Sequence, residues 1–146
     1  MQQQNKEISY ETAKQIVKEN SKERWYNNWR NDEKGRQLYK YLPTPNSKDP
    51  INKLNRKDYC NIFRLRTGHS NLNHHKNRID PTVAPNCRHC GYHHETVEHH
   101  LLQCTALAEL RRELLPTSPN FENCLYGNKL QLEKTSKFHS MASRGL

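Results

Sequence analysis

The sequence predicts a mainly α-helical fold: a small helical domain organised around one zinc knuckle, with polar or disordered termini. The length of 146 residues fits one ordinary domain. Only 32% of the residues are hydrophobic, so a large self-sufficient core is not expected. Apolar residues recur at helical spacing between Pro- and Gly-rich breaks. Residues 87–104 gather Cys and His side chains, which favours a metal site as the organising element.

Four segments are expected along the chain. They are an N-terminal helical segment over 1–41, a Pro-rich linker over 42–50, a region of basic helices with the CCHC zinc knuckle and a following helix over 51–116, and a C-terminal extension over 117–146. The three prolines of the linker favour turns over helix. A short helix is also expected near 129–137, and the last residues are expected to fray.

The first segment is expected to form one long helix over about 10–31. An apolar stripe at helical spacing supports it, formed by Tyr10, Ala13, Ile16, Val17, Trp25 and Trp29. Two Trp residues one turn apart are more often packed than used as a binding platform, so Trp25 and Trp29 are interpreted as packing residues. Gly35 is expected to end or interrupt the helix.

Two short basic helices are expected after the linker. The first begins at its cap Asn55, ends at Gly68 and carries Tyr59, Ile62, Phe63 and Leu65; the second covers about 71–79. Positive charge exceeds negative charge here, and the whole chain has a net charge of +9. This excess predicts a phosphate-facing surface, although two solvated amphipathic helices explain it equally well. Its candidate residues are Lys53, Arg56, Lys57, Arg64, Arg66, Lys76 and Arg78.

The strongest chemical signal is the spacing Cys87-x2-Cys90-x8-His99-x4-Cys104. Thiolate sulfur and imidazole nitrogen are preferred zinc ligands, and Gly91 permits the tight turn after the Cys pair. A helix is expected over 97–115. On a regular helix His100 lies on the same face as Cys104, whereas His99 fits only in an irregular first turn. Weaker candidates are His89, His93 and His94.

Three blocks of residues together resemble a known family. They are Trp25-x3-Trp29 followed by Gly35; Arg64-Leu65-Arg66-Thr67-Gly68-His69-Ser70-x-Leu72; and Cys87-x2-Cys90-Gly91, Glu95-Thr96-x-Glu98-His99-x4-Cys104 and Arg111. The pattern is similar to the C-terminal zinc-binding region of non-LTR retrotransposon polyproteins of the Jockey and I type, which follows the reverse transcriptase and ribonuclease H domains. The resemblance implies one structural Zn²⁺ held by Cys87, Cys90, His99 and Cys104.

The resemblance also implies a role in holding template RNA or target DNA. Arg88 is a further candidate contact, and Tyr92 is expected either to stack on an unpaired base or to pack on the knuckle. The paired aspartates of a reverse transcriptase and the spaced carboxylates of a ribonuclease H are missing from the sequence. The chain is therefore expected to be a non-catalytic nucleic-acid-binding tail, truncated or domesticated.

Two other function classes fit the sequence less well. One is a zinc-stabilised protein-interaction module that presents leucines of the 97–115 helix. The other is a small His/Cys nuclease that uses His74–His75 or His93–His94, although the strand pattern of such enzymes is weak here. The expected partner is RNA or DNA, with no membrane and no small-molecule substrate. A nuclear or cytoplasmic location is expected, because the N-terminus lacks the apolar stretch of a secretory signal.

Overall fold

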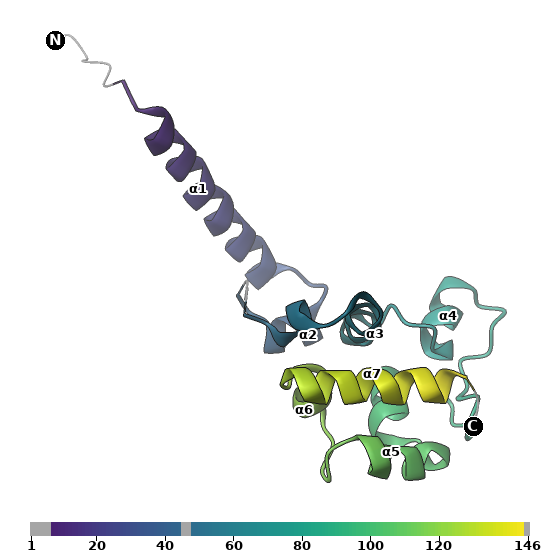
Figure 1. The fold of residues 1–146 in the computed structure, drawn as a ribbon. Helices are drawn as coiled ribbons and strands as arrows, with labels where there is room; N and C mark the ends of the chain where they lie inside the picture. Colours follow the sequence, from purple (N-terminus) through teal and green to yellow (C-terminus); the bar gives the residue numbers. More distant parts are fainter. Residues whose placement is uncertain (1–6, 45–47, 145–146) are drawn as a thin grey trace. The chain divides into compact units, whose positions relative to one another are not determined.

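The computed structural model describes residues 7–44 and 48–144, and within them it contains helices and turns but no strand. The predicted helical fold class is thus confirmed (Figure 1). The chain divides into two compact units, Met1–Thr44 and Pro45–Leu146. The division falls inside the predicted linker 42–50, of which residues 45–47 lie outside the described residues. No helix of the described part is long and apolar enough to cross a membrane.

The first unit is built on α1 (Tyr10–Asn31), which occupies the range expected from the sequence. The Ser9 side chain accepts a hydrogen bond from the backbone N–H of Thr12 and caps the helix. No residue of α1 is buried, and Trp25 is 43% exposed. The expectation that Trp25 packs in a core was therefore wrong, although its ring contacts the rings of Tyr26 and Trp29. The described part of this unit adds only the short α2 (Arg36–Tyr41), which is too small to cover a 22-residue helix.

Trp29 has the packing role that was expected, at the corner between α1 and α2. Its indole Nε1–H donates to the carbonyl of Leu42 at 2.9 Å, and its ring lies edge-on to Tyr39. The Arg36 guanidinium packs on both rings and donates to the carbonyl of Trp29. Gly35 has a positive φ of 68°, and a Cβ there would meet the Trp29 ring at 3.1 Å. Close backbone approach to the indole thus explains this glycine.

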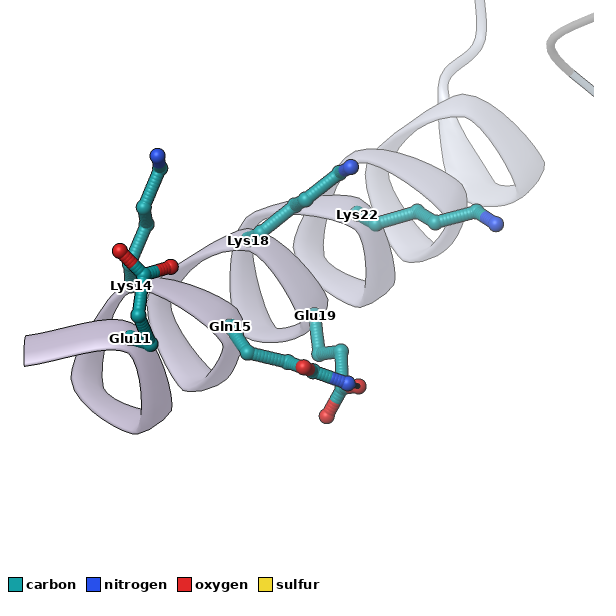
Figure 2. Close-up of a pocket in the computed structure, with 6 residues that line it drawn as sticks. All are labelled: Glu11, Lys14, Gln15, Lys18, Glu19 and Lys22. Carbon is teal, nitrogen blue, oxygen red and sulfur yellow. Dashed lines mark hydrogen bonds between the residues drawn. The ribbon is translucent and has the colours of Figure 1, made fainter. Parts of the chain in front are cut away.

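One side of α1 carries a row of cations. Lys14, Lys18 and Lys22 recur every fourth residue and project along the same stretch of helix (Figure 2). Gln15 and Glu19 form a hydrogen-bonded pair beside this row, with 3.0 Å between Nε2 and Oε1. This cationic row was not predicted from the sequence, although its four-residue period places it on one helix face.

The second unit is organised around α7 (Lys129–Ser143), which begins at a capping box formed by Asn128 and Gln131. Four elements pack on it: η1 (Pro50–Lys53), α3 (Arg56–Thr67), α5 (Ala108–Leu114) and α6 (Phe121–Leu125) (Figure 1). Leu132 and Phe138 of α7 are fully buried. The residues expected to form a C-terminal extension, 117–146, therefore supply α6 and the central helix of this core.

The helix expected over 97–115 is not continuous. The chain forms a π-helical turn η2 (His99–Gln103), then a 3-10 turn η3 (Thr105–Leu107), and only then α5. The short helix α4 (Asn73–Ile79) precedes them and agrees with the expected helix near 71–79. The break falls at Cys104, whose extended ψ of 118° ends the π turn. The apolar periodicity across 97–115 hid this break, because the leucines on both sides face the same core.

Candidate metal centre

Two chain segments bring four ligand atoms together in the second unit. Cys87 and Cys90 come from the loop that follows α4, and His99 and Cys104 come from the two ends of the π turn. All four ligand atoms lie within 4.8 Å of one another. The sulfurs of Cys87 and Cys104 are 3.8 Å apart, and Cys90 Sγ lies 3.3 Å from His99 Nε2. This cluster can hold one metal ion.

The Cys87–Cys90 turn is formed by two backbone hydrogen bonds. The N–H of Gly91 donates to the carbonyl of Cys87, and the N–H of Cys87 donates to the carbonyl of Tyr92, both at 2.8 Å. Gly91 adopts a φ of 75°, which a residue with a Cβ rarely adopts. The turn thereby places both thiols on one side of the loop.

The π turn selects His99 over His100. The N–H of Cys104 donates to the carbonyl of His99 at 2.7 Å, a bond that spans five residues instead of the four of an α-helix. This extra residue brings His99 and Cys104 onto one side, which a regular helix does for His100 and Cys104. Within the described residues, the ligand cluster includes none of the weaker candidates His89, His93 and His94.

His100 points instead into the core. It is 2% exposed and packs edge-on against Phe138, and its Nε2 lies 3.1 Å from Nδ1 of His139. Burial, together with the neighbouring charges, lowers the pKa of His100 to about 3 and that of His139 to about 4. Both imidazoles are therefore neutral at pH 7, and one N–H is shared between the two rings.

Glu95 links the metal-binding loop to α4. Its carboxylate is fully buried; Oε2 accepts the first N–H of α4, from Asn73, at 2.7 Å, and Oε1 accepts from Arg88 Nε at 3.1 Å. Arg88 also donates to the carbonyl of Asn71. Arg88 was predicted as a nucleic-acid contact, and this stays a prediction, because its side chain is 35% exposed although its guanidinium makes these two bonds. Its position is explained by support of the metal centre.

Two further side chains support the π turn. Arg111 donates from Nε to the carbonyl of Leu101 at 2.7 Å and from Nη2 to the carbonyl of Cys104 at 3.0 Å. The Thr96 hydroxyl accepts the N–H of His99 at 3.1 Å. Arg111 thus bonds two carbonyls of the irregular turn, of which the Cys104 carbonyl also accepts the N–H of Leu107, and Thr96 bonds its first N–H. Glu95, Thr96 and Arg111 of the sequence motif are thus structural partners of the ligands.

Tyr92 packs on the ligand imidazole. Its ring is stacked on His99 with centroids 4.6 Å apart and planes within 6°. Of the two roles expected for Tyr92, packing on the knuckle is the one that the structure displays. The side chain remains 50% exposed, so it shields the imidazole on one side only.

The protonation of the thiols is uneven. Burial raises the pKa of Cys104 to about 12. The pKa of Cys90 is below its ordinary value. Burial by itself would raise this pKa, but hydrogen bonds from the Tyr92 N–H and the neighbouring thiols outweigh the effect of burial. Since a metal binds the thiolate form, an incoming ion must displace the proton of Cys104.

The predicted phosphate contacts separate into two groups. Lys53, Arg56, Lys57 and Arg64 are exposed on η1 and α3, and on α4 Arg78 is exposed and Lys76 half-buried. Arg66 is 6% exposed, so the prediction that it contacts nucleic acid was wrong. It lies one turn after the buried Ile62, on the face of α3 that packs inward.

Arg66 is instead the centre of a buried polar network. Its guanidinium forms two bonds to the Asp49 carboxylate, at 2.7 and 3.1 Å, and donates from Nε to the carbonyl of Leu125 at 2.6 Å. It also lies over the ring of Tyr126, 4.5 Å from its centroid. Burial by itself raises the pKa of Asp49, but bonds from Arg66 and the Ile51 N–H outweigh it and lower that pKa. Sequence reasoning missed Asp49, whose place before Pro50 marks a helix cap.

Comparison of the chain with models of protein families, with curated proteins and with solved structures gives no match.

Proposed function

We propose that this protein is a zinc-stabilised, non-catalytic nucleic-acid-binding protein that corresponds to the C-terminal zinc-binding region of a retrotransposon reverse transcriptase polyprotein. The metal centre supplies the fold, and the basic surface of η1 and α3 supplies the contacts to phosphates. The observation that carries the proposal is the set of exposed cations on these two elements. The family assignment is supported by the three sequence blocks.

Zinc is supported by the chemistry and spacing of the donors. Three sulfurs and one nitrogen are a common structural zinc set. With Zn–S bonds of about 2.3 Å, the edge between two sulfurs of a tetrahedron is about 3.8 Å, which matches the separation of Cys87 and Cys104. Four protein ligands leave no position for a reacting water, so the ion acts by holding the fold. Cys87 and Cys104 also belong to the hydrophobic core, which couples metal binding to core packing.

The basic surface is supported by exposed cations that form no ion pair within the described residues. Within residues 7–44 and 48–144, no ion pair involves Lys53, Arg56, Lys57 or Arg64. Arg56 and Lys57 occupy the first turn of α3, where the helix dipole disfavours positive charge. Residues that reduce helix stability in this way are expected where function requires them. Phosphate neutralisation is such a function.

The motif residues support the retrotransposon assignment through their structural roles. Leu65 and Arg66 fill the core side of α3, and Gly68 ends the helix with a φ of 73°. Glu95 and Thr96 hold the loop and turn that carry the ligands. The second and third blocks that carry the resemblance therefore include residues that support the core and the candidate metal centre.

The first experiment measures metal. Protein purified without added metal is analysed for elements, and its thermal unfolding is followed before and after chelation. We expect one zinc per chain and loss of the second unit on chelation, since metal binding contributes to folding free energy. Cys90→Ser is expected to lose the ion, whereas Cys60→Ser, a cysteine outside the cluster, is expected to retain it. Zinc-free protein with an unchanged melt would refute the zinc centre.

The second experiment measures nucleic-acid affinity against salt concentration. On a single strand, the slope of log K against log salt falls by about 0.7 for each phosphate that the protein no longer neutralises. Lys57→Ala with Arg64→Ala is therefore expected to reduce the slope by about 1.4. Arg112→Ala, which removes an exposed cation of α5, is the matched control and is expected to leave the slope unchanged. If the affinity for nucleic acid does not fall with salt, phosphate contacts do not drive binding. That result would favour the alternative of a protein-interaction module.

A further inference from the structure

The solvent-facing side of α3 carries two large aromatic side chains. Tyr59 and Phe63 lie one helical turn apart and are 38% and 49% exposed. Their rings are nearly parallel, with centroids 6.1 Å apart and planes within 7°. The sequence pattern had placed both residues with the apolar positions of this helix. Two aromatic rings exposed side by side offer flat apolar faces to a ligand.

The opposite side of α3 already has its packing partners. Ile62 and Leu65 are buried in the core, and the Asn61 amide donates to the hydroxyls of Ser136 and Ser140 in α7. These contacts fix the rotation of α3 about its axis. Tyr59 and Phe63 therefore stay on the outer side while the unit is folded.

Cations accompany the aromatic pair on this outer side. At about 100° per residue, Arg56 lies within about 60° of Tyr59 and Phe63 around the helix, whereas Lys57 and Arg64 lie further round the outer side, roughly 100–160° from the two rings. All three cations are exposed. The surface thus combines flat apolar rings with positive charges, and its charge is complementary to a phosphate backbone.

We infer that the Tyr59–Phe63 pair is a stacking platform for unpaired bases, so the nucleic acid recognised by this protein is single-stranded. The inference rests on the proposed function and specifies its ligand. Bases in a duplex have their faces covered by neighbouring base pairs, whereas a single strand offers them to aromatic side chains. The cations beside the platform neutralise the phosphates that connect the stacked bases. Stacking tolerates any base, so sequence preference is weak.

The test uses the zinc-loaded full chain and three fluorescent probes of equal length: a mixed-sequence single strand, the corresponding duplex, and an abasic strand with the same phosphates. Fluorescence anisotropy at one moderate salt concentration gives each affinity. Wild-type protein is expected to bind the single strand at least about five-fold more tightly than the abasic strand. The variant Tyr59→Leu with Phe63→Leu is expected to lose this difference. It should bind the single strand only as tightly as it binds the abasic strand.

Four controls isolate the contribution of the two rings. Tyr10→Leu, an exposed aromatic of α1, is expected to retain the preference. Circular dichroism and zinc content of the double variant report whether it folds, and Phe63→Tyr, which keeps an aromatic ring, is expected to bind like wild type. Light scattering of the wild type and the double variant reports self-association through the pair.

The outcomes distinguish the two proposals. If wild-type protein binds none of the probes, the proposed function fails, and this inference with it. If it binds all three equally and the double variant does the same, phosphate binding stands but the stacking platform is refuted. If the double variant loses a dimer and keeps its preference for the single strand, the pair is a self-association surface and the inference is also refuted.

Discussion

Substitution of Arg66 by Met should strongly destabilise the second unit, although most arginines tolerate this change. The guanidinium is 6% exposed and makes three hydrogen bonds, two of them to the Asp49 carboxylate. Removal of one partner leaves the other charge buried and unpaired, which costs about 3–5 kcal/mol. Small domains have a total stability of about 5–15 kcal/mol. The variant therefore loses a large share of its stability.

Urea denaturation of zinc-saturated protein, followed by far-ultraviolet circular dichroism, measures this loss. Arg64→Met is the matched control, because Arg64 lies on the same helix but is exposed, and its loss should stay within about 0.5 kcal/mol. Addition of Asp49→Asn to Arg66→Met removes the unpaired charge while keeping an acceptor for the N–H of Ile51. We expect a coupling energy of about 1–3 kcal/mol. Equal losses for Arg66→Met and Arg64→Met would refute the buried ion pair.

Three further predictions concern the metal centre. Elemental analysis should find one zinc per chain in His100→Leu but less in His99→Ala; zinc-free His100→Leu would reverse the ligand assignment. Glu95→Gln should keep its zinc but lose about 2 kcal/mol in urea denaturation, because charged hydrogen bonds to Asn73 and Arg88 are weakened; a neutral effect would contradict that role. Gly91→Ala should cost about 1 kcal/mol, because alanine is strained at the left-handed φ of this position. Chelator competition should show this cost as weaker zinc affinity. Unchanged affinity would argue that the turn does not need a positive φ.

Local chemistry made several elements predictable. Asn55 and Gly68 mark the two ends of α3 because an amide side chain can cap a helix start and a glycine accepts the positive φ after its end. The clustering of Cys and His at zinc-like spacing indicated which part of the chain holds the metal centre. These signals depend on residues close together in sequence.

Tertiary effects explain what the sequence left open. The π turn at His99 depends on the metal ligands and on Arg111, which bonds the carbonyls of the turn. A helical periodicity cannot reveal such a turn, since leucines before and after it face one core. Arg66 was grouped with surface cations by residue type. Its helical phase, one turn after Ile62, would have placed it on the buried side.

If the cluster binds zinc as proposed, the membership of Cys87 and Cys104 in the hydrophobic core makes the folded population depend on free zinc concentration. An ion that binds only the folded state stabilises it by RT ln(1 + [Zn]/Kd), or about 1.4 kcal/mol for each tenfold rise in free zinc above Kd. Solutions buffered at different zinc activities should thus shift the unfolding midpoint of residues 45–146 logarithmically. Residues 7–44 of the first unit contribute none of the four candidate ligands, so the helicity of α1 should not follow zinc.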